Sequence, residues 1–173
     1  MEIRHKHSSK IKFPEIVVRE YDFDKFCTKY RIFSDIVSEM KNIIGSGFKN
    51  YLVNVVSAEY KAGERTCSDT RYHIDGDFNG GNEYCIWCSG VNRTIFPSET
   101  IEFQDFPADR NSQNVFLERA LKHKKSFEIP NQTFVYYSSK DPHKGVNCKK
   151  PGNRVFIRLM GTNYIGAKNY AKI

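Results

Sequence analysis

The sequence has no long apolar run and few cysteines, and these absences exclude several classes of protein. None of its 173 residues lies in a run approaching the ~18 consecutive apolar residues that a membrane-spanning helix needs. Residues 1–13 are rich in charge and lack the apolar stretch of a secretory signal. The five cysteines are an odd and small number, which argues against a disulfide scaffold. We therefore expect a soluble protein with free thiols in the reducing cytoplasm and no membrane association.

Common catalytic signatures are missing as well. Residues 45–47 lack the third glycine of a dinucleotide-binding loop, and the chain contains neither a Walker sequence nor a Gly-x-Ser-x-Gly elbow. No repeat or linker rich in proline, glycine or serine divides the chain, and 39% hydrophobic residues suffice for a core. We predict one domain over residues 1–173, with an N-terminal extension and helix at 1–50, a β core at 51–160 and a C-terminal tail at 161–173.

Helical periodicity is found in two segments. Within residues 22–44, apolar side chains recur at helical spacing, Ser34 is the predicted N-cap and Gly45 is a stop signal. We expect this helix to pack one face against a sheet. The stretch 111–124 predicts a second helix, and the apolar run 13–18 predicts an edge strand.

Short runs rich in β-branched and aromatic residues follow the first helix, and clusters of Gly, Asn, Asp and Pro separate them. These runs cover residues 51–60, 84–88, 94–96, 133–137 and 154–160. Short strands with frequent turn signals predict a sandwich or barrel rather than an alternating β/α sheet. The expected fold is mainly β with flanking helices, in the form of a helix-backed barrel or jelly roll.

A His-x-Asp pair is the first candidate for chemistry. His73 and Asp75 stand where a predicted strand runs into a loop rich in Gly and Asn, and residues i and i+2 of a strand point to the same face. His143 is the remaining histidine outside the basic N-terminal segment and the lysine-rich segment near residue 123. Two histidines and a carboxylate make a facial triad that suits iron(II). The competing interpretation is that these are unrelated surface residues.

The predicted strand at residues 154–160 alternates strictly in polarity. Apolar residues occupy one face, and two arginines with an aromatic residue occupy the other: Val155, Ile157 and Leu159 against Arg154, Phe156 and Arg158. Arginines that face into a barrel are buried and need an anion, and a guanidinium pairs bidentately with a carboxylate. The alternative is that both arginines face water.

Taken in order, these residues resemble the pattern of the iron(II)- and 2-oxoglutarate-dependent oxygenases. The pair His73-x-Asp75, the distant His143, and Arg154 after a glycine-containing turn follow the family order His-x-Asp…His…Arg. The flanking segments are similar too: a Tyr-x-x-Gly segment precedes the motif and a strand pair follows it, at residues 59–63, 84–90 and 94–96. The resemblance covers residues 51–160.

The resemblance implies a double-stranded β-helix (a jelly roll or cupin-like barrel) that holds iron(II) through His73, Asp75 and His143. It also implies that the distal carboxylate of the cosubstrate 2-oxoglutarate meets Arg154, with Arg158 assisting and Tyr60 donating its hydroxyl. The implied reaction couples oxidative decarboxylation of 2-oxoglutarate by O2 to hydroxylation, or oxidative demethylation, at a substrate C–H bond. No catalytic side chain beyond the metal ligands is implied.

Two alternatives remain. Cys85-x-x-Cys88, together with Cys67 and Cys148, offers four thiolates for structural zinc, although a strand would place positions 85 and 88 on opposite faces. A barrel of the same ancestry that has lost turnover would instead be a basic binding or structural module.

The charge balance indicates what kind of partner or substrate the protein binds. The 27 Lys+Arg exceed the 20 Asp+Glu, giving a net charge of +7 that attracts anions. Lysines also flank His143, at positions 140, 144, 149 and 150. We rank nucleic acid slightly ahead of a protein side chain or a small metabolite as substrate, although the segment before the predicted core leaves little room for a nucleic-acid lid.

Overall fold

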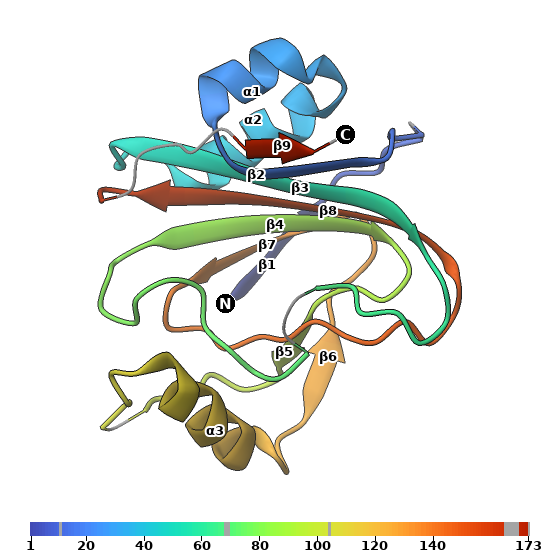
Figure 1. The fold of residues 1–173 in the computed structure, drawn as a ribbon. Coiled ribbons are helices and arrows are strands. Elements are labelled where there is room, and N and C mark those ends of the chain that lie inside the picture. The colour runs from blue at the N-terminus through green and yellow to red at the C-terminus, as the bar shows by residue number, and fades with distance from the viewer. Residues whose placement is uncertain (11, 68–69, 104, 165–169, 173) are drawn as a thin grey trace.

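The computed structural model describes residues 1–173 except 11, 68–69, 104, 165–169 and 173. Most of its regular structure is strand (Figure 1). The elements are β1 Glu2–Lys6, β2 Ile16–Asp22, α1 Phe23–Lys29, a 3-10 turn Arg31–Phe33, α2 Ser34–Ile44, β3 Asn50–Tyr60, β4 Glu83–Gly90, β5 Ile95–Pro97, α3 Arg110–Leu121, β6 Ser126–Glu128, β7 Thr133–Ser138, β8 Gly152–Thr162 and β9 Tyr170–Lys172.

A seven-stranded sheet in the order β1-β7-β4-β8-β3-β2-β9 forms the centre of the protein. Its neighbouring strands are antiparallel, and β8 pairs along its whole length with β3. The prediction of a mainly β fold with flanking helices is confirmed, as are the predicted strands at β3, β4, β5, β7 and β8. The apolar run 13–18 contains the start of a strand, β2, as predicted, but the prediction that it is an edge strand is wrong, because β2 lies between β3 and β9, and β9 comes from the predicted tail.

Helices α1 and α2 cover one face of this sheet, as Figure 1 shows. One side of α2 is buried against it, through Ile36, Val37, Met40 and Ile44. The prediction of Ser34 as an N-cap is wrong: the 3-10 turn runs directly into α2, and the Ser34 hydroxyl donates to the Arg31 carbonyl at 2.7 Å. Gly45 ends the helix at φ 88, a conformation that favours glycine, so that prediction is confirmed.

A smaller layer lies on the opposite side of the sheet, where Figure 1 shows β5, β6 and α3. Strands β5 and β6 pair with each other, and isolated bridges join Arg65 to Asn147, His73 to His143 and Ile95 to Lys144. These bridges bring four separate segments into one layer. The double-stranded β-helix remains an interpretation of this arrangement, since most of the layer consists of single bridges.

Helix α3 fixes the position of the His-x-Asp segment. Its N-cap Asp109 accepts a hydrogen bond from the Ser112 amide, and its buried leucines pack against Tyr72 and Ile74. The carboxylate of Glu118 accepts a hydrogen bond from the Tyr72 amide at 2.7 Å. The predicted helix at 111–124 is confirmed with shifted bounds. Each described helix is too short or too polar to span a lipid bilayer.

Candidate metal centre

His73, Asp75 and His143 lie together. Their ligand atoms are all within 4.8 Å of one another, and no other such group occurs among the described residues. Two backbone hydrogen bonds of 2.9 Å, one in each direction, join His73 to His143. This pairing places the two imidazoles side by side although they are distant in the sequence.

The His-x-Asp segment presents both ligands to the same side, as the alternation predicted. Tyr72 and Ile74 are buried against α3, so His73 and Asp75 point the other way. The segment is not the regular strand that the sequence suggested. Only His73 makes a bridge, and a glycine with φ 69 at position 76 starts the turn that follows.

Backbone carbonyls orient both imidazoles. His73 Nδ1 lies 2.9 Å from the Arg71 carbonyl oxygen, and His143 Nδ1 lies 3.3 Å from that of Asp141. In the tautomer that donates from Nδ1, Nε2 carries the lone pair that a metal accepts. Such carbonyl contacts are typical of histidines that bind metals.

Three side chains contact the Asp75 carboxylate. Arg158 Nη1 lies 2.6 Å from Oδ1, the Tyr137 hydroxyl donates to Oδ2 at 2.7 Å, and His143 Nε2 lies 3.4 Å from Oδ2. Burial opposes the charge, but attraction to Arg158 and His143 and the Tyr137 hydrogen bond overcome it. They hold the pKa of Asp75 well below its usual range. Asp75 is therefore an anion at neutral pH.

Tyr137 is a residue of the site that sequence reasoning missed. Burial and the negative charge of Asp75 raise its pKa well above the usual value, so it stays a neutral donor. The signal was present in the alternation of β7, where Val135 and Tyr137 share the face away from the helices.

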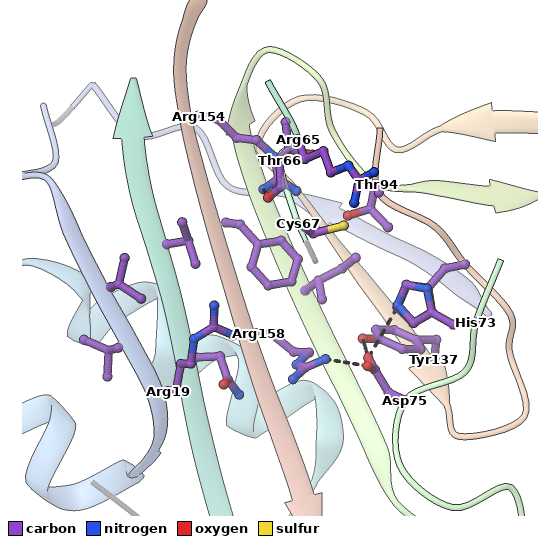
Figure 2. A pocket seen from close by; sticks show the side chains of 18 of the residues that line it. Arg19, Arg65, Thr66, Cys67, His73, Asp75, Thr94, Tyr137, Arg154 and Arg158 are labelled. Atoms are coloured by element: carbon purple, nitrogen blue, oxygen red, sulfur yellow. Dashed lines mark hydrogen bonds and ion pairs between the residues drawn. The ribbon is translucent and has the colours of Figure 1, made fainter. Parts of the chain in front are cut away.

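A cavity of about 580 Å³ is lined by the three candidate ligands, of which His73 and Asp75 are labelled in Figure 2. Arginines dominate the charges on its wall: Arg19, Arg65, Arg110, Arg154 and Arg158. Figure 2 shows Arg154 with Arg65 and Thr66 at one end, and Arg158 with Arg19 and Asp75 at the other. Tyr60 lines the cavity as well, and its role as a hydroxyl donor stays a prediction.

Arg154 is buried in this wall, with 3% of its surface exposed. Its Nη1 donates to the Thr66 carbonyl oxygen at 3.3 Å, its guanidinium lies 5.1 Å from the centre of the Phe156 ring, and its Nε is buried with no partner. No described carboxylate lies within ion-pair distance of it. A buried guanidinium in this state is suited to receive an anion from the cavity.

Arg158 shares a strand face with Arg154, as the alternation of β8 predicted, whereas Ile157 and Leu159 pack on the helix side. Arg158 forms an ion pair with Asp75, so it is not a second unpaired cation beside Arg154. The sequence showed the face that Arg158 occupies, but the contact partner comes from a distant loop.

The cysteines do not form a thiolate site among the residues that the structure describes. Cys85 lies in the core under the helices, and Cys88 lies in the core on the cavity side. The predicted opposite facing is confirmed, and no described metal-ligating group includes a cysteine. Burial raises the pKa of both thiols, which keeps them protonated.

The sequence matches no known family model, and a search of curated proteins finds no significant similarity. The likeness to the oxygenases therefore depends on the motif order and on the geometry of the site.

Proposed function

We propose that the protein is an iron(II)- and 2-oxoglutarate-dependent oxygenase that hydroxylates or oxidatively demethylates a substrate C–H bond. One observation carries the proposal: the His73, Asp75 and His143 group shares a cavity with a buried Arg154 that has a polar atom without a partner. A candidate metal site and a candidate anion site that line one cavity match what this cosubstrate requires.

The donor set fits iron(II). Two imidazoles and one carboxylate give a facial triad, which leaves coordination positions for a chelating cosubstrate and for O2. Thiolates, which would favour zinc, are missing from the group among the described residues. When bound, the iron would supply the redox chemistry that activates O2.

The protein's own residues bind, orient and exclude water. Arg154 would pair with the distal carboxylate of 2-oxoglutarate through its fork of donors. The apolar side chains of Val56, Ile86 and Phe156 also line the cavity. Tyr137 and Arg158 fix the orientation of the Asp75 carboxylate.

A second candidate, a binding module without turnover, is favoured by the state of Asp75. Both of its oxygens already have partners within the protein, so the same residues would also form a stable ion-pair network without a metal. A carboxylate has about four acceptor sites, however, and these contacts leave room for a ligand bond. The two candidates differ in whether 2-oxoglutarate is consumed.

Succinate formation separates them. Purified protein is incubated with iron(II), 2-oxoglutarate, O2 and ascorbate, which supplies the two electrons that a substrate C–H bond would otherwise provide, and succinate is measured for the wild type, His73→Ala and the control His123→Ala. His123 is exposed and lies outside the site. We expect succinate from the wild type and the control and none above background from His73→Ala. Equal yields from all three folded proteins, or no yield from any, would contradict the proposed activity.

A further inference from the structure

We infer that the cavity contains a second anion-binding site, formed by Asn54, Arg158 and Arg19, which receives the carboxylate or phosphate group of a small substrate. That the bound group belongs to a substrate rests on the proposed function. The site itself stands on separate observations and lies at the end of the cavity away from Arg154 (Figure 2).

Asn54 is the first of these observations. It is the polar residue within the apolar run Leu52–Val56 of β3, it lines the cavity, and only 7% of its surface is exposed. Its Oδ1 accepts a hydrogen bond from the Glu20 amide at 3.2 Å, while its Nδ2 is buried with no partner. A buried amide donor without a partner is costly, so a ligand acceptor accounts for its presence.

Arg158 stands directly opposite Asn54 in the β3–β8 register. Side chains of such cross-strand pairs lie next to each other on one face of the sheet. Arg158 uses Nη1 for Asp75, and its Nε is buried with no partner. The pair therefore presents two unpartnered donors at neighbouring positions, one of them on a cation.

A distortion of β2 completes the site. The pairing of β2 with β3 shifts between Val18 and Tyr21, and Glu20 has a φ of 48, an unusual value for a residue with a side chain. The distorted residues include Arg19, which lines the cavity. Because of the same distortion, the Glu20 backbone amide donates a hydrogen bond to the side-chain oxygen Oδ1 of Asn54. This hydrogen bond orients the side-chain NH2 group of Asn54.

The charges of the cavity favour an anion beyond the cosubstrate. Five arginines line it, and Asp75 is the one carboxylate among its described lining residues. The charges of iron(II) and of doubly ionised 2-oxoglutarate cancel, so the excess of positive charge would persist when both are bound. A volume of about 580 Å³ is in the range of small-molecule sites. The buried position of Asn54 favours a small anion over a polymer that lies along the surface.

The test measures anion binding rather than turnover. Inorganic phosphate and acetate are titrated separately into ¹⁵N-labelled protein, alone and with Zn(II) and saturating 2-oxoglutarate, and affinities are taken from NMR chemical-shift changes. Asn54→Asp keeps the acceptor for Glu20 and replaces the donor. Asn42→Asp makes the same change at an exposed position of α2, and Arg19→Gln is matched by Arg119→Gln on the exposed side of α3.

We expect at least one of the two anions to bind in both states, with affinity reduced tenfold or more by Asn54→Asp, several-fold by Arg19→Gln, and unchanged by the two controls. Phosphate binding alone identifies a phosphate ester as the substrate class, and acetate binding alone identifies a carboxylate. Loss of anion binding in Arg154→Gln but not in Asn54→Asp would overturn the inference, as would equal anion affinity in all variants. Binding of a single-stranded oligonucleotide with neither small anion bound would overturn it in favour of nucleic acid.

The same titrations separate this inference from the proposed function. If 2-oxoglutarate binds and no anion binding depends on Asn54, the second site is wrong and the oxygenase proposal stands. If phosphate or acetate binds through Asn54 and 2-oxoglutarate does not bind, the site is real and the oxygenase proposal is wrong.

Discussion

The two faces of the central sheet are built from the same strands, and both carry buried apolar side chains, but only one of them also carries buried arginines. On the helix side, β8 contributes Ile157 and Leu159 to an apolar core with α1 and α2. On the cavity side, the same strand contributes Arg154 and Arg158. Five described side-chain atoms are buried without a partner, and three of them belong to Asn54, Arg154 and Arg158 on the cavity side.

This difference separates stability from binding. Apolar burial on the helix side is a strongly favourable term in folding and holds β3, β4 and β8 in register. The buried Arg154 on the cavity side does not stabilise the fold, since taking a charge out of water is costly unless it is fully paired. Substitutions on the two faces should therefore affect different measurements.

Leu159→Ala should give the largest change in stability. Leu159 is fully buried under the helices, and truncating such a leucine costs about 2 to 5 kcal/mol of unfolding free energy. Urea unfolding measures the loss, and the affinity for 2-oxoglutarate in the folded protein should stay unchanged. A weaker cosubstrate affinity without a loss of stability would break the comparison between the faces.

Arg154→Met makes the reverse change on the same strand. Removing the guanidinium should weaken 2-oxoglutarate binding about 30-fold or more, because the cosubstrate carboxylate would lose its buried partner. Unfolding free energy should change by no more than about 1 kcal/mol, since Arg154 makes one hydrogen bond and has no carboxylate partner among the described residues. Calorimetric titration with iron(II) replaced by Mn(II) gives the affinity. An unchanged 2-oxoglutarate affinity would contradict the role of Arg154.

Tyr137→Phe and Tyr136→Phe compare the faces at adjacent positions of β7. The Tyr137 hydroxyl supports Asp75, so its removal should lower metal affinity about tenfold, in the range found for groups that orient a ligand. Tyr136 packs toward the helix side, and its variant should bind metal like the wild type. Competition with a chelator of known affinity measures both. Equal metal affinities for the two variants would contradict the proposed role of Tyr137 in orienting Asp75.

Ionisation of Tyr84 should have the smallest effect on stability, and this effect should be seen only at alkaline pH. Burial and the negative charge of Asp75 raise its pKa to about 12, whereas an unfolded tyrosine ionises near 10. Folding thus favours the neutral phenol, so its contribution to stability is complete below pH 10 and is lost as the pH rises toward 12. The difference in phenolate absorbance between wild type and Tyr84→Phe measures the ionisation of Tyr84 as the pH rises. Ionisation near pH 10 would contradict the raised pKa.

Residues whose role follows from local pattern could be predicted from the sequence. The alternation of β8 showed which residues share a face with Arg154, and the spacing of His73 and Asp75 showed that both ligands point the same way. The turn at Gly45 followed from the local conformational preference of glycine. Each of these needs only the period of a strand or the properties of one residue.

Residues whose role depends on distant contacts could not be predicted. The pairing of Arg158 with Asp75 and the hydrogen bond from Tyr137 join segments far apart in the chain. Short β6 has too few residues to show alternation, and the exposed β1 has no apolar pattern. Asn54 left a signal, a polar residue inside an apolar strand, but its orientation depends on the distortion at Glu20.

The most direct test of the metal and cosubstrate site is an anaerobic titration with iron(II) and then 2-oxoglutarate, followed by visible absorption. We predict a new charge-transfer band in the wild type that is absent from folded His73→Ala, because that variant lacks one of the three ligands. Absence of the band from folded wild-type protein freed of other metals would contradict the proposed site. The arginine-lined cavity would then belong to an anion-binding module.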